Sequence, residues 1–196
     1  MKTLGVSFLV FSCAACVPFY VETYYHPEAP TGIVARSTYC GAGPSNRIQF
    51  TVGDIGVSLV AYRTDQALRV SLSFSIPESK TVILRSRVVH IRMPATSSEF
   101  RAEFIQATLG GEYPPPREPA DRPMIGGTKV FKREGVLPPP PPRPVFYVLE
   151  TTANVPDAEI LMIKLPPFEI NGTPFELPEV ALTRKKHVGF LETINC

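Results

Sequence analysis

The sequence predicts an all-β protein built as an antiparallel β-sandwich of the immunoglobulin-like kind, with a closed β-barrel as the alternative. Apolar and polar residues alternate over many short stretches, and each stretch is bounded by Gly, Pro, Ser or Asn. No stretch shows a sustained helical period with capping residues at both ends. We expect one domain, because 196 residues suffice for a single hydrophobic core and no internal repeat divides them.

The clearest strand signal lies at residues 68–76, where Leu, Val, Phe and Ile alternate with Arg and Ser. Successive side chains of a strand point to opposite faces, so this pattern predicts one buried face and one exposed face. Gly53 and Asp54 break the pattern between two earlier runs. By the same reasoning, strands are expected at 47–52, 57–61, 81–84, 87–93, 100–107, 145–151, 159–165, 168–170, 173–177, 180–183 and 187–192.

The Asn171-Gly172 pair stands between two alternating runs at 168–177. A two-residue hairpin turn of type I′ needs a positive φ at both central residues, which Asn and Gly tolerate best. The pair therefore predicts a tight β-hairpin at this point of the chain.

Proline is concentrated in one region of the sequence. The chain has 22 prolines, about twice the ordinary usage, and half of them lie between Pro114 and Pro144. We expect residues 110–144 to form a long surface excursion between two strands. Pro138, Pro141 and Arg143 fit the PxxP pattern that aromatic grooves bind, so they are candidate partner-binding residues.

The N-terminus has the layout of a secretory signal peptide. Lys2 is followed by an uncharged run from Thr3 to Val21 that is mostly apolar and then rich in small residues. The run is close to the roughly 20 residues that span a bilayer, so an uncleaved transmembrane anchor is the main alternative and a buried N-terminal segment is another. Pro18 and Ser12 favour the cleaved signal.

The end of this run resembles the lipobox of bacterial lipoprotein precursors. The better frame is Cys13-Ala14-Ala15-Cys16, and a second frame, Val10-Phe11-Ser12-Cys13, carries a bulky Phe where a small residue is usual. The resemblance implies a signal peptide over 1–15, a Cys16 that carries acyl chains such as palmitate, and a localisation in the bacterial cell envelope, facing the periplasm or the exterior. Cleavage after Ala15 without a lipid would instead give a secreted protein.

Four cysteines stand at positions 13, 16, 40 and 196. With Cys16 lipidated and Cys13 removed, Cys40 and Cys196 remain and can form a disulfide in an oxidising compartment. With Cys13 lipidated, three would remain, so parity favours Cys16. We accordingly expect an anchor and tether over 16–38 and the sandwich over 39–196.

No catalytic, cofactor or metal motif stands out in the sequence, and we expect no cofactor and no metal site. His26 falls in the expected tether, His90 on the solvent face of a strand, and His187 on a solvated turn after a basic run. Glu150, Asp157 and Glu159 are expected as solubilising groups near strand ends. There is no nucleophile elbow and no P-loop. The net charge of +2 lacks the concentrated basic excess of nucleic-acid binders, so no nucleic-acid partner is expected.

These observations lead to two hypotheses about function. The first is a non-enzymatic, lipid-anchored envelope protein whose sandwich binds or scaffolds another envelope protein or a polysaccharide. The second is an exported hydrolase or carbohydrate-active domain, which requires a concave pocket that holds a histidine or a pair of carboxylates. A secreted adhesion module is a third, weaker interpretation.

Overall fold

The computed structural model describes residues 19–35, 43–64, 67–110, 117–129 and 143–190. All regular structure in these residues is β-strand, and all strand pairs are antiparallel. The strands are β1 (Phe19–Glu28), β2 (Ile33–Ala35), β3 (Arg47–Val52), β4 (Ile55–Arg63), β5 (Leu68–Ile76), β6 (Thr81–Leu84), β7 (Val88–Met93), β8 (Ser98–Glu103), β9 (Gln106–Leu109), β10 (Arg117–Pro119), β11 (Met124–Ile125), β12 (Thr128–Lys129), β13 (Arg143–Ala153), β14 (Ile160–Lys164), β15 (Phe168–Ile170), β16 (Thr173–Phe175) and β17 (Val180–Phe190).

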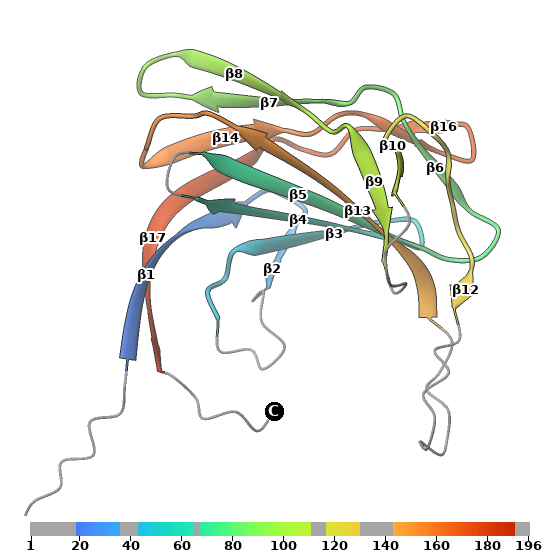
Figure 1. Cartoon of the computed structure of the whole chain (residues 1–196), viewed down its shortest axis with the longest axis horizontal. Helices are drawn as coiled ribbons and strands as arrows, with labels where there is room; N and C mark the ends of the chain where they lie inside the picture. The colour runs from blue at the N-terminus through green and yellow to red at the C-terminus, as the bar shows by residue number, and fades with distance from the viewer. Residues whose placement is uncertain (1–18, 36–42, 65–66, 111–116, 130–142, 191–196) are drawn as a thin grey trace, which may run out of the picture.

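The strands form two packed layers, as Figure 1 shows. The first layer is an eight-stranded sheet with the order β10-β9-β13-β5-β4-β3-β2, and β12 also pairs with β13. The second layer contains a five-stranded sheet, β1-β17-β14-β7-β8, and a four-stranded sheet, β11-β6-β15-β16. The predicted all-β antiparallel sandwich is confirmed, and the described strands do not close into the barrel of the alternative. In the first layer, β2 to β5 follow one another in chain order as a meander.

The two sheets of the second layer are one sheet with an interruption. β14 pairs with β7 up to Lys164↔His90, and β15 pairs with β6 from Phe168↔Leu84 onwards. Residues 85–87 and 165–167 lie between these two ladders and belong to no strand. Pro166 and Pro167 have no backbone N–H to give to a ladder, so the pairing must stop there. A backbone hydrogen bond, from the Arg85 N–H to the Pro167 carbonyl at 2.9 Å, bridges the interruption.

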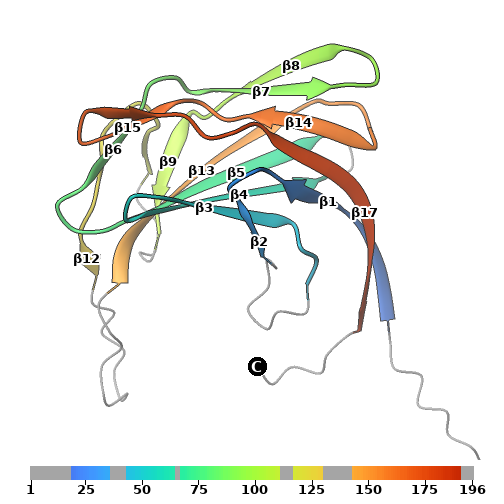
Figure 2. The same ribbon diagram turned by 180° about the vertical axis from the view of Figure 1, so that it is seen from behind.

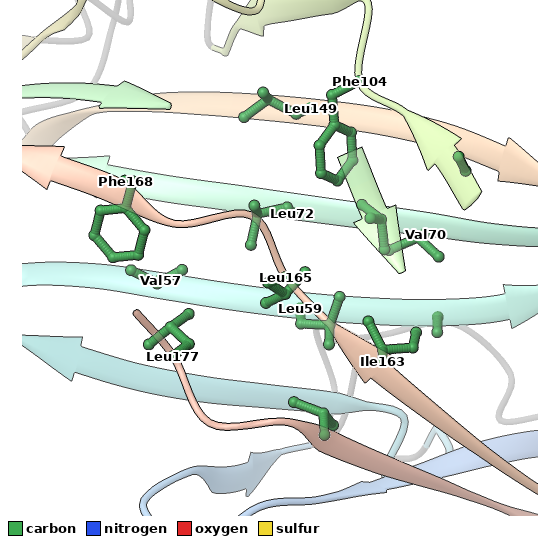
Figure 3. Packing of buried hydrophobic residues seen from close by; sticks show 14 of the residues in the cluster. Val57, Leu59, Val70, Leu72, Phe104, Leu149, Ile163, Leu165, Phe168 and Leu177 are labelled. Atoms are coloured by element: carbon green, nitrogen blue, oxygen red, sulfur yellow. The ribbon is translucent and has the colours of Figure 1, made fainter. Parts of the chain in front are cut away.

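The core lies between the layers and follows the alternation of the sequence. Along β5, every second residue from Leu68 to Ile76 is buried. Figure 3 shows side chains of the first layer, such as Leu72 and Leu59, among those of the second layer, such as Ile163 and Leu165. Phe168 is 1% exposed and meets the Phe74 ring edge to face at 5.4 Å between centroids. This aromatic contact ties the four-stranded sheet to the first layer.

The predicted hairpin at 168–177 is confirmed. Phe168 pairs with Phe175 and Ile170 with Thr173, and the turn residues Asn171 and Gly172 have φ values of 49° and 83°. The Asn171 side chain also accepts a hydrogen bond from the Thr81 N–H at 2.9 Å, which fixes the turn against the start of β6.

The expected tether is wrong for residues 19–28. They form β1, which pairs with β17 over ten positions from Phe19↔Phe190 to Glu28↔Ala181. Tyr, Val and Thr are strong strand formers, and Tyr25 is 2% exposed, with its hydroxyl donating to the Ala158 carbonyl at 3.0 Å. Burial is the main cause that raises the pKa of Tyr25 above its ordinary value of 10.0.

Two further expectations need correction. The expected strand at 180–183 and residues 187–190 of the expected strand at 187–192 are parts of one strand, β17, so His187 lies within a strand and not on a turn. The proline-rich excursion returns to the sandwich in its middle, where β10, β11 and β12 pair with β9, β6 and β13. Ala120 and Met124 are buried there, at 0% and 2% exposed. The segment is held on the sandwich by these buried apolar side chains, which the proline-rich composition of the region did not indicate.

Replacing Phe168 with Ala should lower the free energy of unfolding by about 3–5 kcal/mol, because it empties a fully buried aromatic site between two sheets. The measurement is urea denaturation followed by far-UV circular dichroism. Phe146→Ala is the matched control, since the Phe146 side chain is 42% exposed and its loss should cost about 1 kcal/mol or less. Equal losses for the two variants would contradict the proposed packing.

Candidate functional site

A concave site lies over the interruption in the second layer. We call it the β7 groove, and it has a volume of about 450 Å³. It is lined by Ser86, Val88, His90, Arg92, Glu99, Lys164, Leu165, Pro166, Pro167 and Glu179. A larger depression of about 710 Å³ beside β8, β9 and β13 is more open to solvent, so the more enclosed β7 groove is the better candidate.

The sequence explains why the groove forms here. Pro166 and Pro167 end the ladder between β14 and β7, and the two halves of the layer separate at that point. Alternation along β7 then places Val88, His90 and Arg92 on the same outer face, while Val89 and Ile91 point into the core at 0% exposed. The groove therefore combines an apolar base with charged sides.

The charged side chains of the groove are held in ion pairs, one between β7 and β8 and two with the segment between β16 and β17. The His90 Nδ1 donates to the Glu99 carboxylate at 2.7 Å, and Arg92 Nη2 donates to both Glu179 oxygens at 3.2 and 3.0 Å. Lys164 pairs with Glu176 at 2.8 Å. These pairs leave cationic and anionic groups side by side along the groove.

The pKa values follow these pairs. The hydrogen bond from His90 is the main cause that lowers the pKa of Glu99 below its ordinary value of 4.5, with Arg101 as a weaker cause. The hydrogen bond to Glu176 is the main cause that raises the pKa of Lys164 above 10.5. Both carboxylate and ammonium are thus stabilised in their charged forms at neutral pH.

The hydroxyl and the imidazole of the groove have separate hydrogen-bond partners. Its one hydroxyl, that of Ser86, accepts a bond from the Val88 N–H at 3.1 Å, and His90 is engaged by Glu99. Among the described side chains no hydrogen bond joins Ser86 to His90, which a serine nucleophile and its base require. The arrangement suits a ligand with groups of both charges that lies over an apolar base.

The other histidines lie on β1 and β17. His26 contacts the Ser45 carbonyl through Nδ1 at 3.0 Å and lies 3.7 Å from Glu28. His187 and His26 both meet the Tyr24 ring edge to face, at 6.4 and 6.3 Å between centroids. Histidine, cysteine and carboxylate side chains nowhere gather into a group of three that could hold a metal ion, within the described part of the chain.

The acidic residues expected near strand ends are ion-pair partners. Glu150 lies in the middle of β13 and binds Arg69 at 2.6 Å, which raises the pKa of Arg69. Asp157 binds Arg184 at 2.7 Å and lies 3.8 Å from Arg63. Glu150 thus links β13 to β5, and Asp157 links the segment between β13 and β14 to β17.

Most of the site residues predicted from the sequence lie outside the described residues. These are the lipidation candidates Cys13 and Cys16, the disulfide candidates Cys40 and Cys196, and the partner-binding candidates Pro138 and Pro141. Arg143, the third partner-binding candidate, is exposed at the start of β13. Its backbone lies opposite Lys129 in the antiparallel pairing of β12 with β13. The described residues contain no helix that is long and apolar enough to cross a membrane.

Sequence reasoning missed the groove, although it placed His90 on the correct face. The residues that complete the groove, Glu99, Lys164 and Glu179, come from three distant parts of the chain. They meet because β7 pairs with β8 and β14, and because β14 pairs with β17, which begins directly after Glu179. The adjacent prolines at 166 and 167, next to a strand, were the one local signal of an interrupted sheet.

Comparisons with known proteins gave no match: no family model, no curated protein and no solved structure is significantly similar to this chain. The β7 groove is therefore interpreted from its own chemistry.

Replacing His90 with Ala should raise the pKa of Glu99 towards 4.5, because the hydrogen bond that lowers it most is lost. A depressed pKa means that this pair stabilises the fold above the ordinary carboxyl pKa and that the contribution disappears as the pH falls. The measurement is an NMR pH titration of the Glu99 carboxyl carbon. His187→Ala, on a different strand pair, is the control and should leave the titration of Glu99 unchanged.

Proposed function

We propose that this protein is a non-enzymatic, lipid-anchored protein of the bacterial cell envelope that binds another envelope protein through the β7 groove. The observation that carries the proposal is the groove itself, a concave site with opposed charges held in ion pairs and an apolar base. Such a site can recognise a polar, mixed-charge polypeptide segment by exchanging its own ion pairs for pairs with the partner.

Two features favour a polypeptide over a polysaccharide as the partner. The lining residues carry no aromatic ring apart from the imidazole of His90, so the groove lacks a flat platform for a sugar ring. The neighbouring strand β8 is the last strand of its sheet, and its backbone edge can pair with an added strand. A peptide can therefore use both the groove and the adjacent edge.

The anchor rests on the N-terminal sequence. The lipobox-like residues end at Cys16, three positions before β1 begins at Phe19. Two acyl chains or more at Cys16 would hold the domain firmly on a membrane, because a single chain binds only marginally. The disulfide between Cys40 and Cys196 remains part of this proposal.

An exported hydrolase is the second candidate, and one observation favours it. The carboxylate of Glu99 orients His90 inside a concave site, as a carboxylate orients a general base in many enzymes. Hydrolysis assays on the unmodified protein and on His90→Ala separate the two candidates. An enzyme should hydrolyse its substrate and lose that activity in His90→Ala, whereas a binding protein should show no hydrolysis in either form.

The intact mass of the mature protein from the host membrane fraction should match residues 16–196 with a diacylglyceryl group, and it should rise by the mass of two hydrogens after reduction. Cys16→Ser should remove the lipid and accumulate the precursor, whereas Cys13→Ser should not. An unmodified N-terminus at residue 16 would show a secreted protein and would contradict the anchor.

A photoreactive amino acid at position 164, where the Lys164 side chain borders the groove, should cross-link to a specific envelope protein in the native host. Adding Arg92→Glu should suppress the product, because it reverses a charge in the groove. The matched control is the same photoreactive residue at Ile33, which is 71% exposed on β2 in the other layer and should give no such product. A product that glycan hydrolases degrade, and proteases do not, would contradict a protein partner.

A further inference from the structure

The N-terminal part of β1 and the C-terminal part of β17 form a two-stranded ribbon that extends beyond the sandwich. β14 pairs with β17 only at Val180–Thr183, so beyond that point the described strands give β17 no partner except β1. Figures 1 and 2 show this ribbon projecting from the two layers when seen from opposite sides. We call it the β1–β17 ribbon, and it comprises residues 19–24 and 185–190.

Burial falls sharply along the ribbon. Tyr25, at its base, is 2% exposed, whereas Val21 and Val188 are 56% and 55% exposed. The two valines face each other in the register of the strands, so they form one apolar pair on the same face of the ribbon. Two branched apolar side chains are left in the open close to the end of the ribbon.

The next pair on this face is Thr23↔Lys186. Within the described part of the chain, Lys186 is exposed and has neither a hydrogen bond nor an ion pair, whereas Lys185 pairs with Glu28 at 3.6 Å and Arg184 with Asp157 at 2.7 Å. Two residues of strand separate Lys186 from Val188, which corresponds to about 7 Å. The valine pair lies nearer the end of the ribbon, and the Lys186 ammonium lies one pair further from it. This order matches a lipid monolayer, in which the phosphates lie outside the acyl chains.

We propose that the β1–β17 ribbon is a rigid stalk whose tip lies in the surface of a phospholipid bilayer. This inference rests on the proposed lipid anchor at Cys16. Three residues span at most about 11 Å, so the lipid would hold the end of the ribbon within the headgroup region or next to it. The uncharged run that begins at Thr3 also continues into the ribbon as far as Val21.

A bilayer fits this tip better than a protein partner does. Specific protein interfaces bury about 1,200–2,000 Å² in total, and one pair of valines offers only a small part of that area. Insertion into a bilayer needs no such area, because each apolar side chain that leaves water contributes separately. The continuity between the valine pair and the apolar N-terminal run further favours lipid.

The chain has no tryptophan, so a single introduced tryptophan reports its own surroundings without background. The test uses the full mature protein, purified from membranes and reconstituted in phosphatidylcholine vesicles with or without brominated acyl chains. Val188→Trp and Val21→Trp report the tip. Ile105→Trp, at a site that is 67% exposed between β8 and β9, is the matched control on the body.

Both tip variants should show blue-shifted tryptophan emission, and brominated acyl chains should quench most of their fluorescence intensity. The fluorescence of Ile105→Trp should be quenched little. Tip variants that are quenched no more than Ile105→Trp, on a chain whose mass shows the lipid, would overturn the stalk and leave the proposed function intact. If the mass shows no lipid, the anchor fails. Quenching at the tip by added vesicles would then still support membrane contact, and its absence would overturn that contact as well.

Discussion

Two adjacent prolines determine the shape of the second layer. Pro166 and Pro167 offer no backbone donors, so the ladder that β14 shares with β7 cannot run on into β15 and β6. The interruption has two consequences. It opens the β7 groove on the outer face, and it lets the chain turn so that Phe168 packs on Phe74 in the core. Binding site and core contact therefore depend on the same local constraint.

β1 connects the two layers, because it pairs with β17 in the second layer and contacts β3 and β4 in the first. Its ten-position pairing with β17 joins the beginning of the described chain to its end, and Tyr25 inserts between the layers. The hydrogen bond from the Tyr25 hydroxyl to Ala158 satisfies the one polar group that this burial would otherwise leave unpaired. Residues that precede the expected sandwich thus form part of it.

The sequence predicted the local structure well because alternation is a local property. Residues 68–76, 81–84 and 168–170 form strands with the expected bounds, and the Asn171-Gly172 turn has the expected conformation. The failures concern partners. The stretch that contains Tyr25 is rich in residues that favour a strand, but nothing in the stretch indicates that its partner is β17.

The same limit applies to the candidate site. The alternation of residues 87–93 places His90 on the outer face, but the ion pairs with Glu99 and between Arg92 and Glu179 join residues 9 and 87 positions apart. Such pairs depend on register and on sheet order, which a single sequence does not encode in any short window. The proline pair was the local feature that deserved the most weight, because proline inside a strand region has a definite structural cost.

The groove and the ribbon belong to one hydrogen-bonded sheet. β1 pairs with β17, β17 with β14, and β14 with β7, so the groove lies only two strand spacings, about 10 Å, from β17. A two-stranded ribbon has fewer accessible conformations than a single flexible chain, because the ladder bonds hold its strands in register. On a membrane, a stalk made of β1 and β17 would therefore give the groove a fixed height and direction. A partner held in the same envelope would then meet the groove in one orientation, which lowers the rotational freedom lost on binding. In this arrangement the anchor contributes to recognition as well as to localisation.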